Sequence, residues 1–219
     1  MIPCPSPNFD TRTQAISMIV LHYTGMPTAP AAIDRLTDPV AKVSAHYVVV
    51  EDGEVFILVA EKDRAWHAGK SFWRSITDVN SASIGIEIVN PGHEFGYRPF
   101  PEPQMATVES LVRDIAERHA ISPAMIVGHS DIAPLRKIDP GELFDWPRLA
   151  AAGLALPIPE VGLDPDWTEA GFLAALSRFG YDVSAPVAAV SAFQRRFRPR
   201  NFSGVIDAES RALLFALLR

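Results

Sequence analysis

Three things are scarce in this chain of 219 residues: cysteine, positive charge and long apolar runs. With Cys4 as the one cysteine, no internal disulfide can form, so the fold does not depend on an oxidising compartment. Acidic residues outnumber basic ones by 26 to 20, and the formal net charge is −6. This balance argues against a nucleic-acid surface, because phosphate binding needs a basic patch. No stretch approaches the roughly 20 apolar residues of a membrane-spanning helix.

The start of the sequence also lacks the features of an export signal. Residues 1–10, MIPCPSPNFD, have neither a basic beginning nor an apolar core. We therefore predict a soluble, cytoplasmic and monomeric protein with no membrane span. A periplasmic or cell-envelope location is the alternative if a signal sequence has been removed. The chain length suits one sizeable domain followed by a small one.

What the sequence does contain, over residues 1–152, is a set of β-rich runs interspersed with helical segments. This order predicts an α/β fold, with a mixed central β-sheet flanked by helices. The pair Asp52-Gly53 between two β-rich runs predicts a hairpin. We expect strands at 17–22, 44–50, 55–59, 83–89 and 125–129, and helices at 30–36, 102–119 and 146–152.

The last third of the chain has a different character. Residues 153–165 are rich in glycine and proline and are predicted to form a linker. We expect a small three-helix domain over 166–219, with helices at 168–179, 185–197 and 207–218 and with Thr168 and Asp207 as N-caps. A cluster of basic residues near the second helix is interpreted as a solvated face: Arg195, Arg196, Arg198 and Arg200.

Two of the β-rich runs end in a histidine, as when a sheet presents a polar side chain at its rim. His22 ends the run SMIVLH, and His129 ends the run AMIVGH. A lone histidine in such a place is usually a partly exposed residue with one hydrogen bond. Two histidines and a carboxylate, however, match a known ligand set of catalytic zinc, which leaves a fourth position for water. Asp139 and Asp131 both remain candidates for the carboxylate, with a weak preference for Asp139.

Glu87 is the most unusual charge, because it lies within an apolar strand. Alternation places it on the face opposite Ile84, Ile86 and Ile88, next to Gly85, which leaves room for a ligand or a close backbone. One interpretation is a solvated glutamate on an edge strand. The other is a buried carboxylate whose raised pKa suits it to act as a general base.

Other polar and aromatic residues have two interpretations each. Lys137 is either a surface lysine or a cation that stabilises a developing oxyanion. His67, in the segment AWHAG, fits a loop that lines a substrate site. Trp73 either stacks on a sugar or covers the core. His46 is interpreted as a hydrogen-bonded core histidine.

Six short motifs then occur in a recognisable order. They are VLHYT at 20–24, SAHY at 44–47, AWHAG at 65–69, SIGIE at 83–87, GHSDIAP at 128–134 and RKIDPG at 136–141. Together they resemble the zinc-dependent N-acetylmuramoyl-L-alanine amidases of the amidase-2 family, which is related to T7 lysozyme and the peptidoglycan recognition proteins. The segments FGYD at 179–182 and AFQRRFRP at 192–199 are similar to the peptidoglycan-binding helical domain that some members carry.

The resemblance implies a single zinc ion held by His22, His129 and Asp139, which selects Asp139 over Asp131. It implies that Glu87 is the base that activates the zinc-bound water.

The resemblance also assigns roles around the metal. Lys137 would stabilise the tetrahedral intermediate, and Trp66, His67 and Asn90 would line the substrate groove.

The activity implied is zinc-dependent hydrolysis of the amide bond between N-acetylmuramic acid, or its 1,6-anhydro form, and L-alanine of the stem peptide. The expected partner is peptidoglycan or a muropeptide, during cell-wall turnover and recycling. Two other hypotheses stay open: a non-catalytic peptidoglycan-recognition module, and a zinc peptidase that acts on the stem peptide.

Overall fold

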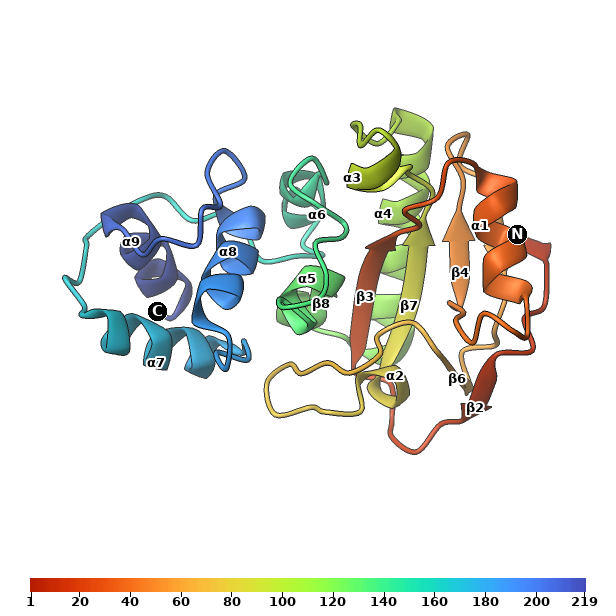
Figure 1. Cartoon of the computed structure of the whole chain (residues 1–219), viewed down its shortest axis with the longest axis horizontal. Helices are drawn as coiled ribbons and strands as arrows, with labels where there is room; N and C mark the ends of the chain where they lie inside the picture. The colour runs from red at the N-terminus through yellow and green to blue at the C-terminus, as the bar shows by residue number, and fades with distance from the viewer.

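A six-stranded mixed sheet forms the centre of the structure, a computed structural model that describes residues 1–219 (Figure 1). The strand order is β1-β5-β4-β7-β3-β8. Neighbours from β4 to β8 pair in parallel, whereas β5 runs antiparallel to β4 and parallel to β1. The strands are β1 (Ile2–Pro3), β3 (Met18–Tyr23), β4 (Tyr47–Val49), β5 (Val55–Ile57), β7 (Ser83–Ile88) and β8 (Ile126–Gly128). A separate antiparallel pair joins β2 (Phe9–Thr11) to β6 (Asp63–Ala65).

Helices flank this sheet, so the predicted α/β class is confirmed. They are α1 (Ala29–Thr37), α2 (Val79–Ala82), α3 (Gly92–Phe95), α4 (Glu102–His119), α5 (His129–Ile132), α6 (Trp146–Ala151), α7 (Glu169–Phe179), α8 (Pro186–Phe197) and α9 (Ala208–Leu217), with a 3-10 turn at Pro123–Met125. Every predicted strand and helix is present with ends shifted by at most a few residues, and the hairpin at Asp52-Gly53 joins β4 to β5. No sequence pattern predicts β6 or the short helices α2, α3 and α5.

One face of the sheet is covered by α4, which lies behind it in Figure 1. Ile84, Ile86 and Ile88 of β7 belong to the hydrophobic cluster on this side, together with Ile19 and Leu21 of β3. Since side chains alternate along a strand, the opposite face receives His22 from β3 and Gly85 and Glu87 from β7. The predicted alternation in β7 is therefore confirmed.

The opposite face is covered at its two ends and left open between them. At the β4–β5 end, Leu36 of α1 packs with Val48 and Val89. At the β3–β8 end, Val20 and Val127 share one hydrophobic cluster with side chains of α7, α8 and α9. The open stretch between these covers is where the polar ends of β3 and β7 lie.

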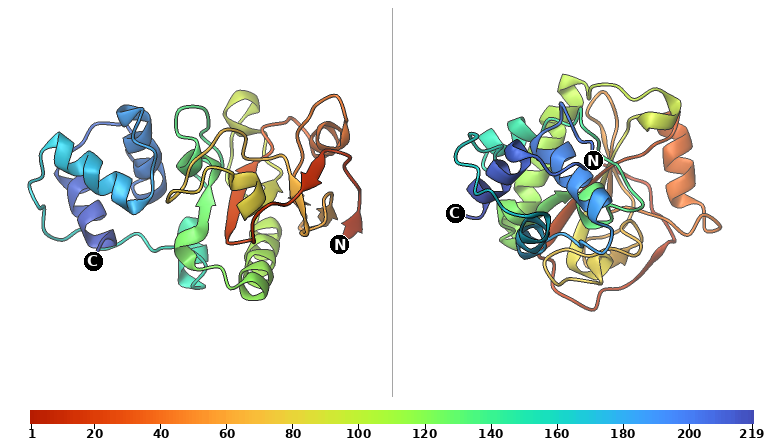
Figure 2. Two further views of the ribbon diagram at one scale, coloured as in Figure 1. Left: turned by 90° about the horizontal axis from the view of Figure 1, so that it is seen from below. Right: turned by 60° about the vertical axis from the view of Figure 1, so that its left-hand side comes forward.

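The three C-terminal helices lie at the end of the molecule opposite the N-terminus (Figure 2). Thr168 and Asp207 accept hydrogen bonds from the backbone of the first turns of α7 and α9, as predicted for N-caps. The prediction of a solvated arginine face is wrong for Arg196 and Arg198, which are 5% and 3% exposed. Acidic partners hold both guanidinium groups inside the protein. No helix of the structure is both long enough and apolar enough to span a membrane.

Candidate active site

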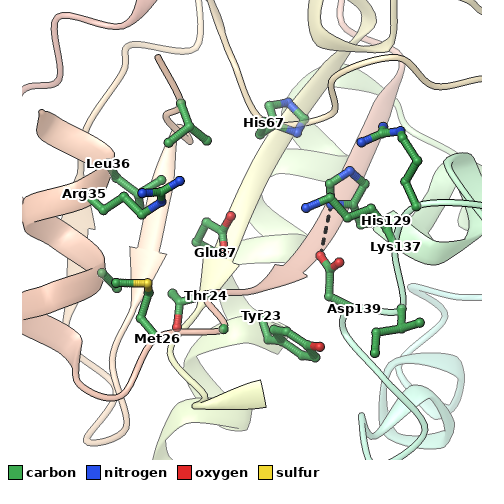
Figure 3. A pocket seen from close by; sticks show the side chains of 15 residues that line it. Tyr23, Thr24, Met26, Arg35, Leu36, His67, Glu87, His129, Lys137 and Asp139 are labelled. Atoms are coloured by element: carbon green, nitrogen blue, oxygen red, sulfur yellow. Dashed lines mark hydrogen bonds and ion pairs between the residues drawn. The ribbon is translucent and has the colours of Figure 1, made fainter. Parts of the chain in front are cut away.

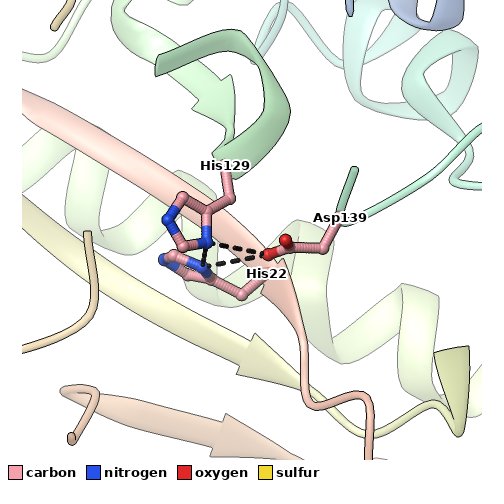
Figure 4. A group of neighbouring side chains, drawn as sticks. All are labelled: His22, His129 and Asp139. Atoms are coloured by element: carbon pink, nitrogen blue, oxygen red, sulfur yellow. Dashed lines mark hydrogen bonds and ion pairs between the residues drawn. The ribbon is translucent and has the colours of Figure 1, made fainter. Parts of the chain in front are cut away.

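Three predicted ligand atoms converge at the open part of the sheet (Figure 4). Nδ1 of His22 lies 2.8 Å from Nδ1 of His129, and Oδ2 of Asp139 lies 3.2 and 3.1 Å from these two nitrogens. Ligand atoms about 2.0–2.1 Å from one tetrahedral zinc ion are separated from each other by roughly 3.3 Å. The three atoms, on residues that are all buried, therefore fit the donor set of one zinc ion.

The secondary structure brings these residues together from distant parts of the chain. His22 lies near the end of β3, and His129 is the first residue of α5, directly after β8. The chain after α5 returns to the sheet, where the backbone N–H of Ser130 donates to the carbonyl of Asp139 at 2.8 Å. A side chain at Gly128 would lie 2.7 Å from Cδ of Pro140, so this close return requires a glycine there.

The protonation preferences of His22 and Asp139 suit metal binding. Burial and the neighbouring His129 lower the pKa of His22 to about 4, so its imidazole is neutral at pH 7. Burial alone would raise the pKa of Asp139, but His129 and His22 outweigh it and hold this pKa below its usual range. A neutral imidazole and an ionised carboxylate are the forms that bind a cation.

The outer nitrogens of both histidines are also occupied. Nε2 of His22 lies 3.0 Å from Nδ1 of His67, whose own Nε2 lies 3.2 Å from Oγ of Ser83. Nε2 of His129 lies 3.1 Å from the carbonyl of Ala68. Partners of this kind fix the orientation of metal-ligating histidines. His67 is thus in a position to orient His22.

Gly85 is what allows His67 to lie there. A Cβ atom at Gly85 would come within 2.4 Å of Cγ of His67. The room expected over Gly85 for a ligand or a close backbone is filled instead by the imidazole ring of His67. Burial, followed by the charges of nearby histidines, lowers the pKa of His67 well below its usual value, which keeps this ring neutral.

A cavity of about 360 Å³ opens beside His129 and Asp139 (Figure 3). Arg35 and Leu36 of α1 line one side, and Lys137 and Asp139 line the other. Glu87 lies between them, with an exposed fraction of 9%. The cavity therefore brings a carboxylate and a cation next to the candidate metal site.

Glu87 is buried in the middle of the sheet, so its interpretation as an edge-strand residue is wrong. Its Oε2 atom has no hydrogen-bond partner. Burial, followed by the negative charge of Asp139, raises the pKa of Glu87 well above its usual value, and Lys137 partly opposes this. A buried carboxylate with a free oxygen beside a cavity has the properties of a general base.

Lys137 extends from the loop between α5 and Asp139 into the wall of the cavity (Figure 3). The residue is half-buried, and its ammonium group forms no ion pair with any carboxylate of the chain. The neighbouring Arg136, by contrast, donates to the carbonyls of Ala68 and Lys70. The charge of Lys137 is therefore available to a bound molecule.

Two other predicted residues do not line this cavity. The indole N–H of Trp66 donates to Asp10 at 2.7 Å. The amide of Asn90 donates to the carbonyl of Arg98 at 2.8 Å and accepts from the N–H of Gly92 at 3.0 Å. Substrate contact by Trp66 and Asn90 stays a prediction.

Hydrogen bonds decide between the two interpretations of Trp73 and support that of His46. His46 is a core residue, with its Nδ1 accepting from the N–H of Gly85 at 2.9 Å, and burial lowers its pKa to about 3. Trp73 covers the core, is 2% exposed, and donates its indole N–H to the carbonyl of Ala124.

Tyr23 and Arg35 are among the residues of the cavity wall that sequence reasoning missed. The hydroxyl of Tyr23 lies 3.0 Å from Nδ1 of His93, and burial, with Asp139 nearby, raises its pKa to about 12. Its place directly after His22 was an available signal. Arg35 had none, because an arginine near the end of a short helix is ordinary.

Comparisons with known proteins agree with this geometry. Residues 12–142 match the amidase-2 family model, described as N-acetylmuramoyl-L-alanine amidase. The Escherichia coli N-acetylmuramoyl-L-alanine amidase AmiD is 37% identical over 246 residues, which cover 95% of this chain and 87% of the relative. The Haemophilus influenzae 1,6-anhydro-N-acetylmuramyl-L-alanine amidase AmpD is 34% identical over 163 residues, which cover 65% of this chain and 86% of the relative.

A solved structure is similar over nearly the whole chain. It is that of E. coli AmiD in complex with the substrate anhydro-N-acetylmuramic acid-L-Ala-D-gamma-Glu-L-Lys. The TM-score is 0.82 at 34% identity, and the match covers 96% of this chain and 97% of the other. The likeness thus includes the C-terminal helices as well as the sheet.

Proposed function

The chain belongs to the amidase-2 family of N-acetylmuramoyl-L-alanine amidases, and from this we propose that it uses one zinc ion to release L-alanine-linked peptides from muropeptides. The bond cleaved is the amide between L-alanine and N-acetylmuramic acid or its 1,6-anhydro form. The anhydro substrate of the E. coli structure and the name of the H. influenzae relative support this substrate class.

One observation carries the proposal: Glu87 offers a free, buried carboxylate oxygen in the wall of the cavity that His129 and Asp139 also line. A buried acid without a hydrogen-bond partner costs stability, so a structural role does not account for it. A proton-transfer role does, because the oxygen must stay free to receive a proton. The same cavity supplies the cation of Lys137.

His22, His129 and Asp139 would hold the zinc ion with two imidazole nitrogens and one carboxylate oxygen. Zinc, when bound, supplies a Lewis acid for the amide carbonyl and lowers the pKa of water toward about 7. Glu87 takes a proton from the attacking water and later delivers it to the departing amine of L-alanine. Lys137 contributes positive charge where the carbonyl oxygen becomes negative.

The raised pKa of Glu87 suits both halves of this proton transfer. An ordinary carboxylate holds a proton too weakly to carry it to a leaving amine at neutral pH. Burial makes Glu87 a stronger base by raising its pKa, and the charge of Lys137 opposes part of this rise.

Digestion of purified anhydro- and reducing-end muropeptides, side by side, tests the proposal. The enzyme is assayed after removal of metal by a chelator and again after addition of zinc, with products identified by mass spectrometry. We expect a peptide that begins with L-alanine and an intact muramyl sugar, formed only with zinc. Binding without cleavage would support a recognition module, and cleavage inside the stem peptide would support a peptidase.

We also propose a division of the chain into two domains and a linker. Residues 1–152 would form the catalytic domain, 153–165 the linker, and 166–219 a domain that binds peptidoglycan. Pull-down of the full chain with insoluble peptidoglycan, at a saturating concentration of a soluble muropeptide, separates binding by the C-terminal helices from binding at the cavity. Cell fractionation and sedimentation check the cytoplasmic location and the monomeric state.

A further inference from the structure

Asp131 lies two residues after His129, and its carboxylate is fully engaged. Oδ2 accepts from the backbone N–H of Gly128 and from Nη1 of Arg196, both at 2.8 Å, and Oδ1 accepts from the hydroxyl of Tyr181 at 2.5 Å. Asp131, Tyr181 and Arg196 are 1%, 0% and 5% exposed. Two of the three donors thus come from the C-terminal helical region, and they reach into the turn that carries His129.

Arg196 also contacts the start of β8, the strand that leads into this turn. Its Nη2 donates to the carbonyl of Ile126, the first residue of β8, at 3.0 Å. The guanidinium carbon of Arg196 lies 3.8 Å from the centre of the Trp146 ring, and this contact fixes the plane of the guanidinium group. One side chain of α8 therefore bonds to β8 at its start and, through Asp131, at its end.

The turn held in this way sets the position of two proposed ligands. Gly128, whose N–H is bound by Asp131, directly precedes His129. Ser130, the residue between His129 and Asp131, donates its N–H to the carbonyl of Asp139. A displacement of Asp131 would therefore move the backbone of both His129 and Asp139.

We propose that Arg196 and Tyr181, acting through Asp131, are positioning residues for the metal site. The C-terminal helices are then part of the machinery that holds the zinc ligands, in addition to any contact they make with peptidoglycan. This inference rests on the proposed function, since it takes His129 and Asp139 as ligands.

The physical basis is the cost of an uncompensated buried charge. Without Arg196, the Asp131 carboxylate would remain buried with a net negative charge beside the turn, a strongly unfavourable state. The turn would shift to bring the carboxylate to water. This shift weakens the hydrogen bond from Gly128 that sets the backbone before His129.

The test compares the zinc affinity of full-length variants, measured by competition with a chromogenic chelator. Arg196→Met removes the ion pair with Asp131. Arg196→Lys keeps the positive charge but lacks the planar guanidinium group. Tyr181→Phe removes only a hydroxyl. The matched control is Arg198→Met, at the same end of α8: Arg198 is also buried but pairs with Asp207 and Glu209 inside the C-terminal region. Circular dichroism establishes that each variant is folded.

We expect Arg196→Met to weaken zinc binding about 10- to 100-fold. Arg196→Lys should recover part of this, and Tyr181→Phe should lose a few-fold. At saturating zinc, the KM for muropeptide should stay at the wild-type value. Arg198→Met should lower the thermal midpoint while leaving zinc affinity unchanged.

Wild-type zinc affinity in both Arg196→Met and Tyr181→Phe would overturn the inference. An equal loss in Arg198→Met would also overturn it, because general weakening of the C-terminal helices would then explain the effect. If Arg196→Met fails to fold, Tyr181→Phe decides the question. A wild-type protein that binds no zinc would instead refute the proposed function, which keeps the two failures distinguishable.

Discussion

Glu87 lies directly beside His22, because β7 and β3 pair in parallel with these two residues in register. The pairing is part of the backbone ladder of the sheet, so the proposed base and one proposed ligand are held at a fixed spacing without any bond between their side chains. A carboxylate within an apolar strand is costly to bury. Its place next to His22 explains why the strand carries it.

The first prediction concerns the role of Glu87 as a base. Glu87→Gln keeps the size of the side chain and removes the proton acceptor. Since Oε2 has no partner, the change breaks no network around the ligands. We expect bound zinc to stay at the wild-type level and kcat to fall by about 10²- to 10⁴-fold. A kcat within a few-fold of wild type, with zinc bound, would rule out this role.

The second prediction concerns Lys137 and pH. Glu87 must be ionised to act, so activity falls as the pH drops through its raised pKa. The charge of Lys137 lowers that pKa. Lys137→Met should therefore move the acid limb of kcat/KM to higher pH, and lower kcat by about 10²-fold through the lost oxyanion contact.

Lys137 also lowers the pKa of His22, so zinc content must be measured at each pH to separate the two effects. If activity and bound zinc fall together as the pH drops, the acid limb reports protonation of His22. If activity falls while bound zinc stays constant, the acid limb reports protonation of Glu87. Lys62→Met, which changes an exposed lysine away from the cavity, is the control. An unmoved limb in Lys137→Met would contradict the coupling.

The third prediction separates two roles for His67. The sequence predicts substrate contact, and His67 does line the cavity, but its Nδ1 also lies 3.0 Å from Nε2 of His22. His67→Phe keeps a ring and removes both hydrogen bonds. If the residue orients His22, zinc affinity should fall about 10- to 100-fold with KM unchanged at saturating zinc. A raised KM with normal zinc affinity would favour substrate contact instead. His119→Phe, which changes a histidine at the end of α4 that pairs with Glu61 away from the cavity, should alter neither value.

A fourth prediction tests the same contact without changing a histidine. In Gly85→Ala the new methyl group would overlap the His67 ring, because a Cβ there would lie 2.4 Å from its Cγ. The ring must move, and the bond to His22 should weaken with it. We expect a loss of zinc affinity similar to that of His67→Phe. Gly162→Ala, where a Cβ meets open space, is the control.

The features that could be predicted from sequence are those that repeat locally. Alternation along β7 identified which face Glu87 occupies, and the 18-residue amphipathic pattern of α4 gave both of its ends. The order of short motifs selected His22, His129 and Asp139, whose polar atoms the structure brings together. Helices of four residues, such as α2, α3 and α5, are too short to show a period.

What could not be predicted depends on contacts between distant segments. The run Arg195–Arg200 has the composition of a basic surface, yet Arg196 is buried because Asp131, 65 positions earlier, neutralises it. His67 meets His22 across 45 positions, through a loop with no regular pattern. In both cases the burial of the polar side chain depends on its partner, and the sequence alone does not identify that partner.

The last prediction concerns stability and pH, away from the cavity. Glu61 accepts hydrogen bonds from Tyr47, Arg118 and His119, each with a shortest distance of 2.7 Å. Burial raises its pKa, but these donors outweigh burial and lower the pKa of Glu61 to about 2. Glu61→Gln should reduce the free energy of unfolding at pH 7 by about 1–2 kcal/mol, since it removes charge-assisted hydrogen bonds.

The sign of the pH dependence follows from the lowered pKa. The unfolded chain binds the proton of Glu61 near pH 4.5, and the folded chain binds it only near pH 2. The stabilisation is therefore complete above pH 4.5 and is lost as the pH falls from about 4.5 to about 2. Urea unfolding of wild type and Glu61→Gln across this range should show the difference shrinking. Glu117→Gln, an exposed change on α4, should show no such trend, and a constant difference down to pH 2 would assign the effect to packing.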